Sequence, residues 1–110
     1  MIDALIGYSL RGAPRGRSAD LIETINHSDA HVVSLDTPSG LNVSDGEAPG
    51  VVVDADATLT LALPKAGLRS SPHVGELFLG DISVPASVMA TLGALPANFA
   101  RSPIVHISTT

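Results

Sequence analysis

Two acidic residues and one serine stand where their side chains could act together. Asp3 lies in the apolar run Ile2–Gly7, and Asp36 closes the β-branched run His31–Asp36. Ser39 follows shortly afterwards in the loop sequence DTPSG. Carboxylate and hydroxyl oxygens from separate loops can hold a hard cation, and a carboxylate can also move a proton as a general acid or base. The three side chains form a candidate site if the fold brings them together.

A glycine-rich segment lies between the two acids. Its residues are Gly7, Tyr8, Ser9, Leu10, Arg11, Gly12 and Ala13. Backbone N–H groups in such a turn can cradle a phosphate group. Simpler alternatives exist, because an aspartate after a strand is commonly a helix cap or a turn former. The arginines of this region are more often a solvated loop face than a phosphate clamp, and spacing alone leaves both alternatives open.

The elements around these residues predict a βαβ unit. The run Ile2–Gly7 is typical of a buried strand that ends in a tight turn, and His31–Asp36 is typical of a strand buried on both faces of a parallel sheet. Between them, apolar residues at helical spacing predict a helix over Ser18–Asn26, with Ser18 as its N-cap and Asp20 in its first turn. Parallel strands end at one edge of the sheet, where ligands bind in open α/β folds. Asp3, Asp36 and the loop after Asp36 should therefore meet at that edge.

The second half of the chain continues the α/β pattern. Leucines alternate with threonine and alanine in a predicted strand over Ala55–Lys65, and one or two short strands are predicted within Gly75–Pro85. A helix is predicted over Pro85–Ala94, with proline in its first turn and a glycine near its end. Residues 93–110 are interpreted as a tail or linker, with one possible short strand over Ile104–Ile107.

Composition excludes several classes of protein. The chain has 110 residues, a net charge of −5, 45% hydrophobic and 3% aromatic residues, which fits a single globular domain. The absence of cysteine excludes disulfide scaffolds, thiolate zinc sites and cysteine nucleophiles. The acidic balance without a basic cluster argues against nucleic-acid binding. No apolar run is long enough for a membrane span and no signal peptide is evident, so a cytoplasmic location is expected.

Several well-known motifs are also excluded. The loop DTPSGLNVSDGE resembles a calcium loop in length, but Pro38 and Gly40 occupy positions that need oxygen ligands. The serine of TPSGL does not lie in the G-x-S-x-G sequence of a hydrolase nucleophile. No histidine pair has the spacing of a helical metal site, and the spacing of Gly7, Gly12 and Gly16 matches neither a P-loop nor G-x-G-x-x-G.

Four segments together resemble a known family. In chain order they are DALIGYSLRGAP, SLDTPSGLNVSDG, LTLALPKAGL and GELFLGDISVP. Their order and separations are similar to the second half of the NAD(P)H-hydrate epimerase family, the YjeF N-terminal domain, over Ile2–Val88. The resemblance implies a Rossmann-like three-layer α/β/α sandwich with a mainly parallel sheet. It also implies an enzyme that interconverts the R and S epimers of hydrated NADH and NADPH, so that a partner dehydratase can restore the cofactor.

The resemblance also implies roles for individual residues. Asp3 and Ser39 would be ligands of a potassium ion, and the segment Gly7–Ala13 would contact the hydrated dinucleotide. Asp36 would contact the same substrate. We infer beyond the resemblance that the Asp36 carboxylate moves the proton as hydroxide leaves and returns at C6 of the nicotinamide ring.

The resemblance lacks one part of the family pattern. The N-G-G-D-G-type loop and the first βαβ portion of the domain have no counterpart, so residues 1–92 are interpreted as the C-terminal part of such a domain. We expect either a separate N-terminal half or a homo-oligomeric partner to complete it. The alternative function is a non-catalytic binding or scaffold module, or an inactive truncated relic of the same fold.

Overall fold

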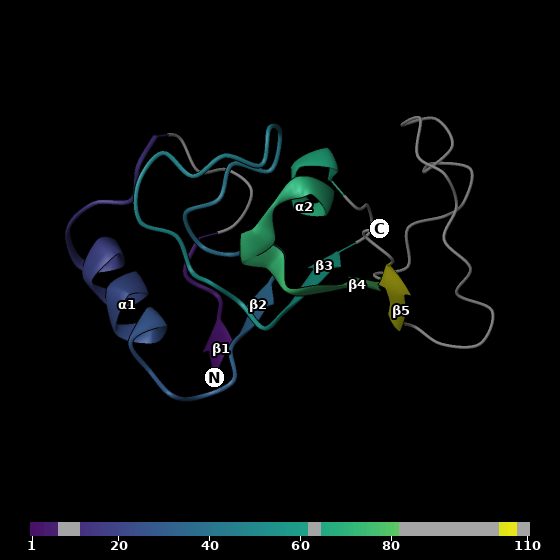
Figure 1. Cartoon of the computed structure of the whole chain (residues 1–110), viewed down its shortest axis with the longest axis horizontal. Helices are drawn as coiled ribbons and strands as arrows, with labels where there is room; N and C mark the ends of the chain where they lie inside the picture. The colour runs from purple at the N-terminus through teal and green to yellow at the C-terminus, as the bar shows by residue number, and fades with distance from the viewer. Residues whose placement is uncertain (7–11, 62–64, 82–103, 108–110) are drawn as a thin grey trace.

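A computed structural model of the chain describes residues 1–6, 12–61, 65–81 and 104–107 (Figure 1). Its centre is a five-stranded sheet. The strands are β1 (Ile2–Asp3), β2 (Val33–Leu35), β3 (Ala57–Leu61), β4 (Glu76–Gly80) and β5 (Ile104–Ile107). The helical elements are α1 (Gly16–Asn26), α2 (Ala66–Ser70) and a single 3-10 turn, Pro72–Val74.

The strands lie side by side in chain order, from β1 to β5. The first four strands are parallel, and β5 runs antiparallel to β4. The predicted α/β class with a mainly parallel sheet is therefore confirmed, as is the possible strand over Ile104–Ile107. The boundary placed at residue 93 stays a prediction, and the helix predicted over Pro85–Ala94 lies outside the described residues.

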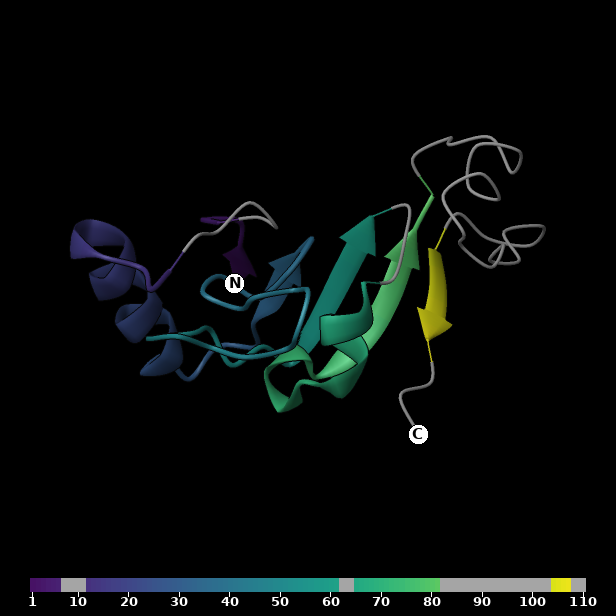
Figure 2. The same cartoon turned by 90° about the horizontal axis from the view of Figure 1, so that it is seen from above.

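One face of the sheet carries the packed core. A buried polar row of Asp3, Ser34 and Thr58 crosses β1, β2 and β3 on this face, because these residues are register partners. A larger apolar cluster covers the β4 end of the face and combines α2, the 3-10 turn and the loop between β2 and β3; it contains Leu41, Val43, Val52, Leu68, Val74 and Leu77. A smaller cluster joins α1 to the same face through Ile22, Val32 and Val53. Figure 2 shows the long loop and α2 on one side of the strands.

The opposite face of the sheet is exposed along β1 and β2. The exposed fractions are 74% for Ile2, 40% for Val33 and 41% for Leu35. These residues alternate with the buried polar row, so they share one face. None of the described helices covers it, and the second helical layer of an α/β/α sandwich does not occur among the residues that the structure describes.

Helix α1 begins earlier than predicted. The extended residue Arg15 occupies the N-cap position without a side-chain bond, and the helix starts at Gly16. The prediction that Ser18 is the N-cap is therefore wrong, and Asp20 lies beyond the first turn, which contains no acidic residue. The start is set by tertiary packing of the apolar face around Ile22, which is fully buried, rather than by a local cap.

The first three strands are shorter than predicted, and β2 covers only Val33–Leu35 of the predicted His31–Asp36. After Asp3, the backbone N–H groups of Leu5 and Ile6 donate to side chains instead of continuing the ladder with β2. Before β3, the N–H of Ala55 donates to the carbonyl of His73, which lies in the 3-10 turn. Side-chain oxygens and a loop carbonyl thus accept bonds from backbone N–H groups that would otherwise pair within the predicted strands.

Candidate functional site

The carboxylate of Asp3 is the centre of a buried hydrogen-bond cluster at the carboxyl edge of the sheet. Ser34 Oγ donates to Asp3 Oδ2 at 2.7 Å, and the backbone N–H of Ser39 donates to the same oxygen at 2.9 Å. Ser39 Oγ donates to Asp3 Oδ1 at 2.6 Å, and a longer bond of 3.4 Å comes from the N–H of Leu5. Asp3 and Ser39 are both fully buried. The predicted approach of Asp3 and Ser39 is confirmed, although they are 36 residues apart in the chain.

The loop that carries Ser39 is held by close backbone packing. Gly40 has a φ of 99°, a conformation that L residues rarely adopt, and a Cβ at this position would overlap the carbonyl oxygen of Val51. The N–H of Val53 donates to the carbonyl of Ser39 at 2.9 Å, and the N–H of Leu41 donates to that of Pro38 at 3.0 Å. The glycine in DTPSG thus lets the loop lie against the segment that leads into β3, which fixes the Ser39 side chain over Asp3.

Asp36 directly follows β2 at the same edge of the sheet. It has a φ of 71° and is the non-glycine residue with a positive φ among the described residues. Its N–H donates to the carbonyl of Leu59 on β3 at 2.7 Å. Lys65 Nζ donates to Asp36 Oδ1 at 3.0 Å, and the two side chains are 25% and 20% exposed for Lys65 and Asp36. A carboxylate in a left-handed turn, largely buried and paired at one oxygen, is suited to meet a ligand with the other.

The donor set around Asp3 fits a hard cation. The carboxylate is fully buried, and none of the ion pairs among the described residues involves it, so a cation there would offset the cost of a buried charge. Carboxylate, hydroxyl and carbonyl oxygens converge, because Ser39 Oγ lies 2.6 Å from Asp3 Oδ1 and 3.4 Å from the carbonyl oxygen of Ile6. No cluster of three His, Cys, Asp or Glu side chains occurs within the described ranges. The chemistry therefore fits a cation that prefers mixed oxygen ligands over one that needs several acids or imidazoles.

The glycine-rich segment is described only in part. Gly7, Tyr8, Ser9, Leu10 and Arg11 lie outside the described residues. Gly12 and Ala13 are exposed, and Gly12 has a φ of 76°. The residue before the segment, Ile6, is tied to the Asp3 cluster, because its N–H donates to Ser39 Oγ at 2.9 Å. The role of this segment in substrate binding stays a prediction.

Sequence reasoning missed two residues of this edge. Ser34 stands inside a strand that was interpreted as apolar, and the register of β1 against β2 was needed to place it opposite Asp3. Lys65 is separated from Asp36 by 29 residues. Its sequence signal was a polar residue that follows a strand in LALPK, the same signal that identified Asp36.

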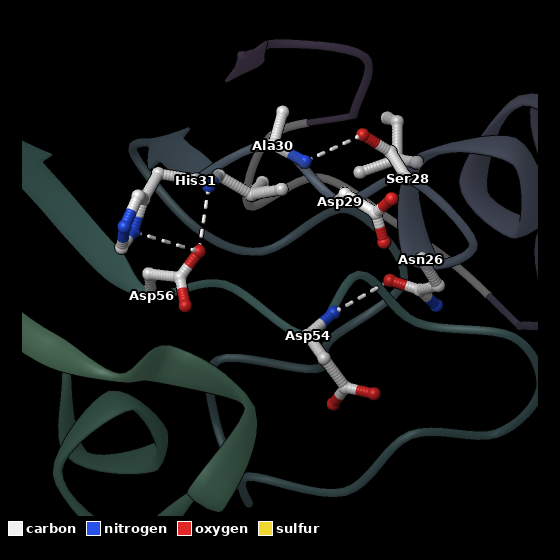
Figure 3. A pocket seen from close by; sticks show the side chains of 9 residues that line it. Asn26, Ser28, Asp29, Ala30, His31, Asp54 and Asp56 are labelled. Carbon is white, nitrogen blue, oxygen red and sulfur yellow. Dashed lines mark hydrogen bonds and ion pairs between the residues drawn. The ribbon is translucent and has the colours of Figure 1, made fainter.

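A separate pocket of about 280 Å³ lies near the opposite edge of the sheet (Figure 3). Its polar groups bond mainly to the protein itself. The N–H of Val32 donates to Asp56 Oδ2 at 2.7 Å, and the N–H of Asp54 donates to Asn26 Oδ1 at 2.9 Å. His31 lies 3.6 Å from the same Asp56 oxygen. These bonds join the end of α1 to the starts of β2 and β3, so the pocket is interpreted as a structural junction.

The sequence matches known proteins over most of its length. The profile of the family described as YjeF-related protein N-terminus matches residues 1–67. An NAD(P)H-hydrate epimerase of Dehalogenimonas lykanthroporepellens is 49% identical over 96% of this chain, and one of Truepera radiovictrix is 44% identical over 86%. These matches cover 41% and 43% of the two relatives, so the chain spans about two fifths of their length. A bifunctional NAD(P)H-hydrate repair enzyme Nnr of Hyperthermus butylicus is 45% identical over 84% of this chain and 18% of its own length.

A solved structure shares the fold. The crystal structure of the yeast protein ynu0 superposes with a TM-score of 0.83 over 96% of this chain and 45% of the yeast chain, at 19% identity. The mainly parallel sheet thus belongs to a Rossmann-like α/β fold. The profile match over more than half of its residues places the chain in the YjeF-related protein N-terminus family.

Proposed function

We propose that this chain provides the proton-transferring part of an NAD(P)H-hydrate epimerase. The observation that carries the proposal is that a buried Asp3–Ser39 cluster and a largely buried Asp36 carboxylate lie at the same edge of the sheet. The relatives with the names reported above support the reaction and the substrate, which is NADH or NADPH hydrated on the nicotinamide ring.

The reaction needs a proton to move at one carbon. When the C6–O bond of the hydrate breaks, the lone pair of the ring nitrogen forms an N1=C6 double bond and the departing oxygen takes a proton to become water. Water then adds to the opposite face of C6, loses a proton and restores the neutral hydrate as the other epimer. Asp36 carries this proton, because its Oδ2 has no bond among the described residues while Oδ1 is held by Lys65.

A potassium ion fits the proposal at Asp3 and Ser39. Asp3 would supply a carboxylate oxygen, Ser39 its hydroxyl and Ile6 a backbone carbonyl. When bound, the ion would supply a fixed positive charge beside the start of the glycine-rich segment. The contact of Gly7–Ala13 and Asp36 with the hydrated dinucleotide belongs to the same proposal.

The epimerase would work together with an NAD(P)H-hydrate dehydratase. Relatives that carry the name bifunctional repair enzyme support this link, since their chains are several times longer than the region matched here. A cytoplasmic location, where reduced nicotinamide cofactors are consumed, is part of the proposal. Among the described residues, no helix is both long and apolar enough to cross a bilayer.

The exposed apolar face of β1 and β2 supports a need for further polypeptide. Ile2, Val33 and Leu35 lie together on it, and an apolar patch of this kind marks a surface that associates. In the proposal it is covered by the remaining part of a complete domain or by a second copy of the chain. The same face favours the second candidate function, a non-catalytic module retained for association.

The test measures epimerisation directly. The chain is assayed alone and co-expressed with the part of the Dehalogenimonas lykanthroporepellens epimerase that it does not match. The assay starts from the pure R hydrate and couples to an S-specific dehydratase. We expect turnover by the wild type, and a loss of about 10²–10⁴-fold in Asp36→Asn while hydrate binding persists, because the asparagine keeps the size but cannot carry the proton.

Two results would contradict the proposal in different ways. If the complemented wild type turns over and Asp36→Asn matches its rate, Asp36 is a turn former and the assigned proton carrier is wrong. If the complemented wild type neither binds nor turns over the hydrate, the association module becomes the better function.

A further inference from the structure

Lys65 has bonds that only a fixed side chain would make. Its Nζ donates to Asp36 Oδ1 at 3.0 Å, to Thr60 Oγ1 at 3.2 Å and to the carbonyl oxygen of Leu61 at 3.4 Å. An ammonium group has three donors, so these three acceptors use all of them. The side chain is three-quarters buried, which limits solvent screening of its pairing with Asp36.

The three acceptors tie Lys65 to rigid structure. Thr60 and Leu61 are the last two residues of β3, and both are paired in register with β4. Thr60 is fully buried, so its hydroxyl does not turn away from Lys65 to bond with solvent. The ammonium group is therefore fixed relative to the sheet and not merely relative to the Asp36 loop.

Asp36 itself needs such an anchor. It lies in a left-handed turn beyond the end of β2, where its backbone is held to the sheet by the bond from its N–H to Leu59. The backbone bond does not fix the carboxylate, which rotates about two side-chain torsions. Among the described residues, the bond to Lys65 is the contact that orients this carboxylate and leaves Oδ2 open.

We propose that Lys65 is a positioning residue of the epimerase reaction: its ammonium group holds Asp36 Oδ1 so that Oδ2 points at the reacting carbon. This inference rests on the proposed function. A misplacement of about 1 Å in a catalytic group can cost about 10²-fold in rate. Loss of the anchor should therefore lower kcat without an equal loss of substrate binding.

The experiment uses the complemented chain and the epimerisation assay described above. Lys65→Met should lower kcat by about 10²-fold with KM changed by less than about 3-fold, because the substitution keeps the Asp36 carboxylate as a substrate contact and removes only the bond that orients it. Lys65→Arg should recover most of the rate, since the guanidinium keeps the charge and the donors. Arg69→Met is the matched control. It removes an exposed cation from α2, the helix that Lys65 precedes as the N-cap residue, and it should retain the wild-type rate.

A double variant separates positioning from an independent role. If Lys65 acts through Asp36, then Asp36→Asn combined with Lys65→Met should be no slower than Asp36→Asn alone. Thermal unfolding of each variant shows whether it is folded at the assay temperature. Thr60→Val, which removes one anchor of the ammonium group and keeps the shape, gives a milder second variant if Lys65→Met does not fold; its kcat should fall several-fold.

Four outcomes would overturn the inference. Lys65→Met, or Thr60→Val where it is the variant that folds, could turn over at the wild-type rate. The double variant could lose a further 10²-fold over Asp36→Asn, which would make Lys65 independent of Asp36. Lys65→Arg could be as slow as Lys65→Met although folded, which would mean that a cation with donors at this position does not restore the orientation of Asp36. A complemented wild type without turnover would contradict the proposed function and this role with it. That outcome is distinct from the other three, because it is seen in the wild type before any variant is compared.

Discussion

At the scale of single residues, Asp3 joins three parts of the chain. Its two oxygens accept bonds from β2 through Ser34 and from the DTPSG loop through Ser39. A buried carboxylate of this kind is stable only while its acceptors stay satisfied and its charge is compensated. The potassium ion proposed here would provide that compensation.

The cation proposal predicts a potassium-dependent melting temperature. Replacing potassium by a bulky organic cation at equal ionic strength should lower the melting temperature of the wild type, by mass action on the folded state. The loss should vanish in Asp3→Asn, which keeps a hydrogen-bond acceptor and removes the charge. Asp20→Asn on the exposed face of α1 is the control and should respond like the wild type. Equal responses of wild type and Asp3→Asn would rule out a site at Asp3.

The left-handed turn at Asp36 predicts an inverted order of stability. Glycine adopts a positive φ freely, whereas alanine pays about 1–2 kcal/mol, and both substitutions delete the bond to Lys65 equally. Asp36→Gly should therefore be as stable as Asp36→Ala or more stable, by up to about 1 kcal/mol after the greater freedom of unfolded glycine is counted. Urea denaturation of both variants measures the difference. A clearly more stable Asp36→Ala would show that the turn relaxes at no cost.

At the scale of the elements, α1 is held by packing and by the side chain of its last residue, Asn26, and not by local caps. Its N-cap residue Arg15 makes no side-chain cap, and its first turn holds no acid and its last turn no base. The fully buried Ile22 is the residue of α1 that lies in the core cluster with Val32 and Val53.

The packing of α1 predicts a sharp contrast between neighbouring residues. Ile22→Ala should lower the free energy of unfolding by about 2–5 kcal/mol, because it leaves a cavity in the core. Leu21→Ala, one position away and 42% exposed, should change it by about 0.5 kcal/mol or less. Chemical denaturation measures both. Similar losses would mean that the exposed Leu21 holds α1 as strongly as the buried Ile22 does.

The sequence predicted which elements form better than it predicted where they end and which face of each is buried. Parallel strands that end at one edge were enough to predict that Asp3 and Ser39 meet, because that geometry follows from topology alone. The alternation in β3 was recognised, but the threonines occupy the packed face: Thr58 is fully buried and donates to the carbonyl of Val74. The Thr58 hydroxyl can be buried because a carbonyl 16 residues away accepts its hydrogen bond, and no local pattern reveals that acceptor. Helix α2 has five residues, too few for a periodic signal.

At the scale of the whole molecule, the core is one-sided. The described helices and the loop between β2 and β3 pack on one face, while Ile2, Val33 and Leu35 stay exposed on the other. Parallel sheets are ordinarily covered on both faces. The isolated chain should therefore associate with itself or be only marginally stable.

The exposed face predicts that two strand substitutions change the assembly. Val33→Thr and Leu35→Thr place β-branched residues that favour strands at both positions and reduce the apolar area of this face, so together they should shift the isolated chain toward monomer. Light scattering after size exclusion measures the mass. Leu21→Thr on α1 removes a similarly exposed apolar side chain elsewhere and should leave the mass unchanged. A wild-type chain that is a stable monomer with cooperative unfolding would contradict the prediction.

The two edges of the sheet have different roles, and Figure 3 shows the bonds at one of them. Asn26, Asp54 and Asp56 fasten α1, β2 and β3 together at the amino edge, and His73 pairs with Asp54 there, while Asp36 and Lys65 lie at the carboxyl edge. Residues at the carboxyl edge can then be exchanged during evolution without dissolving the scaffold that presents them. A lineage of this fold could lose its chemistry, or acquire another, through a few substitutions beyond the ends of β2 and β3, and still produce a chain that folds.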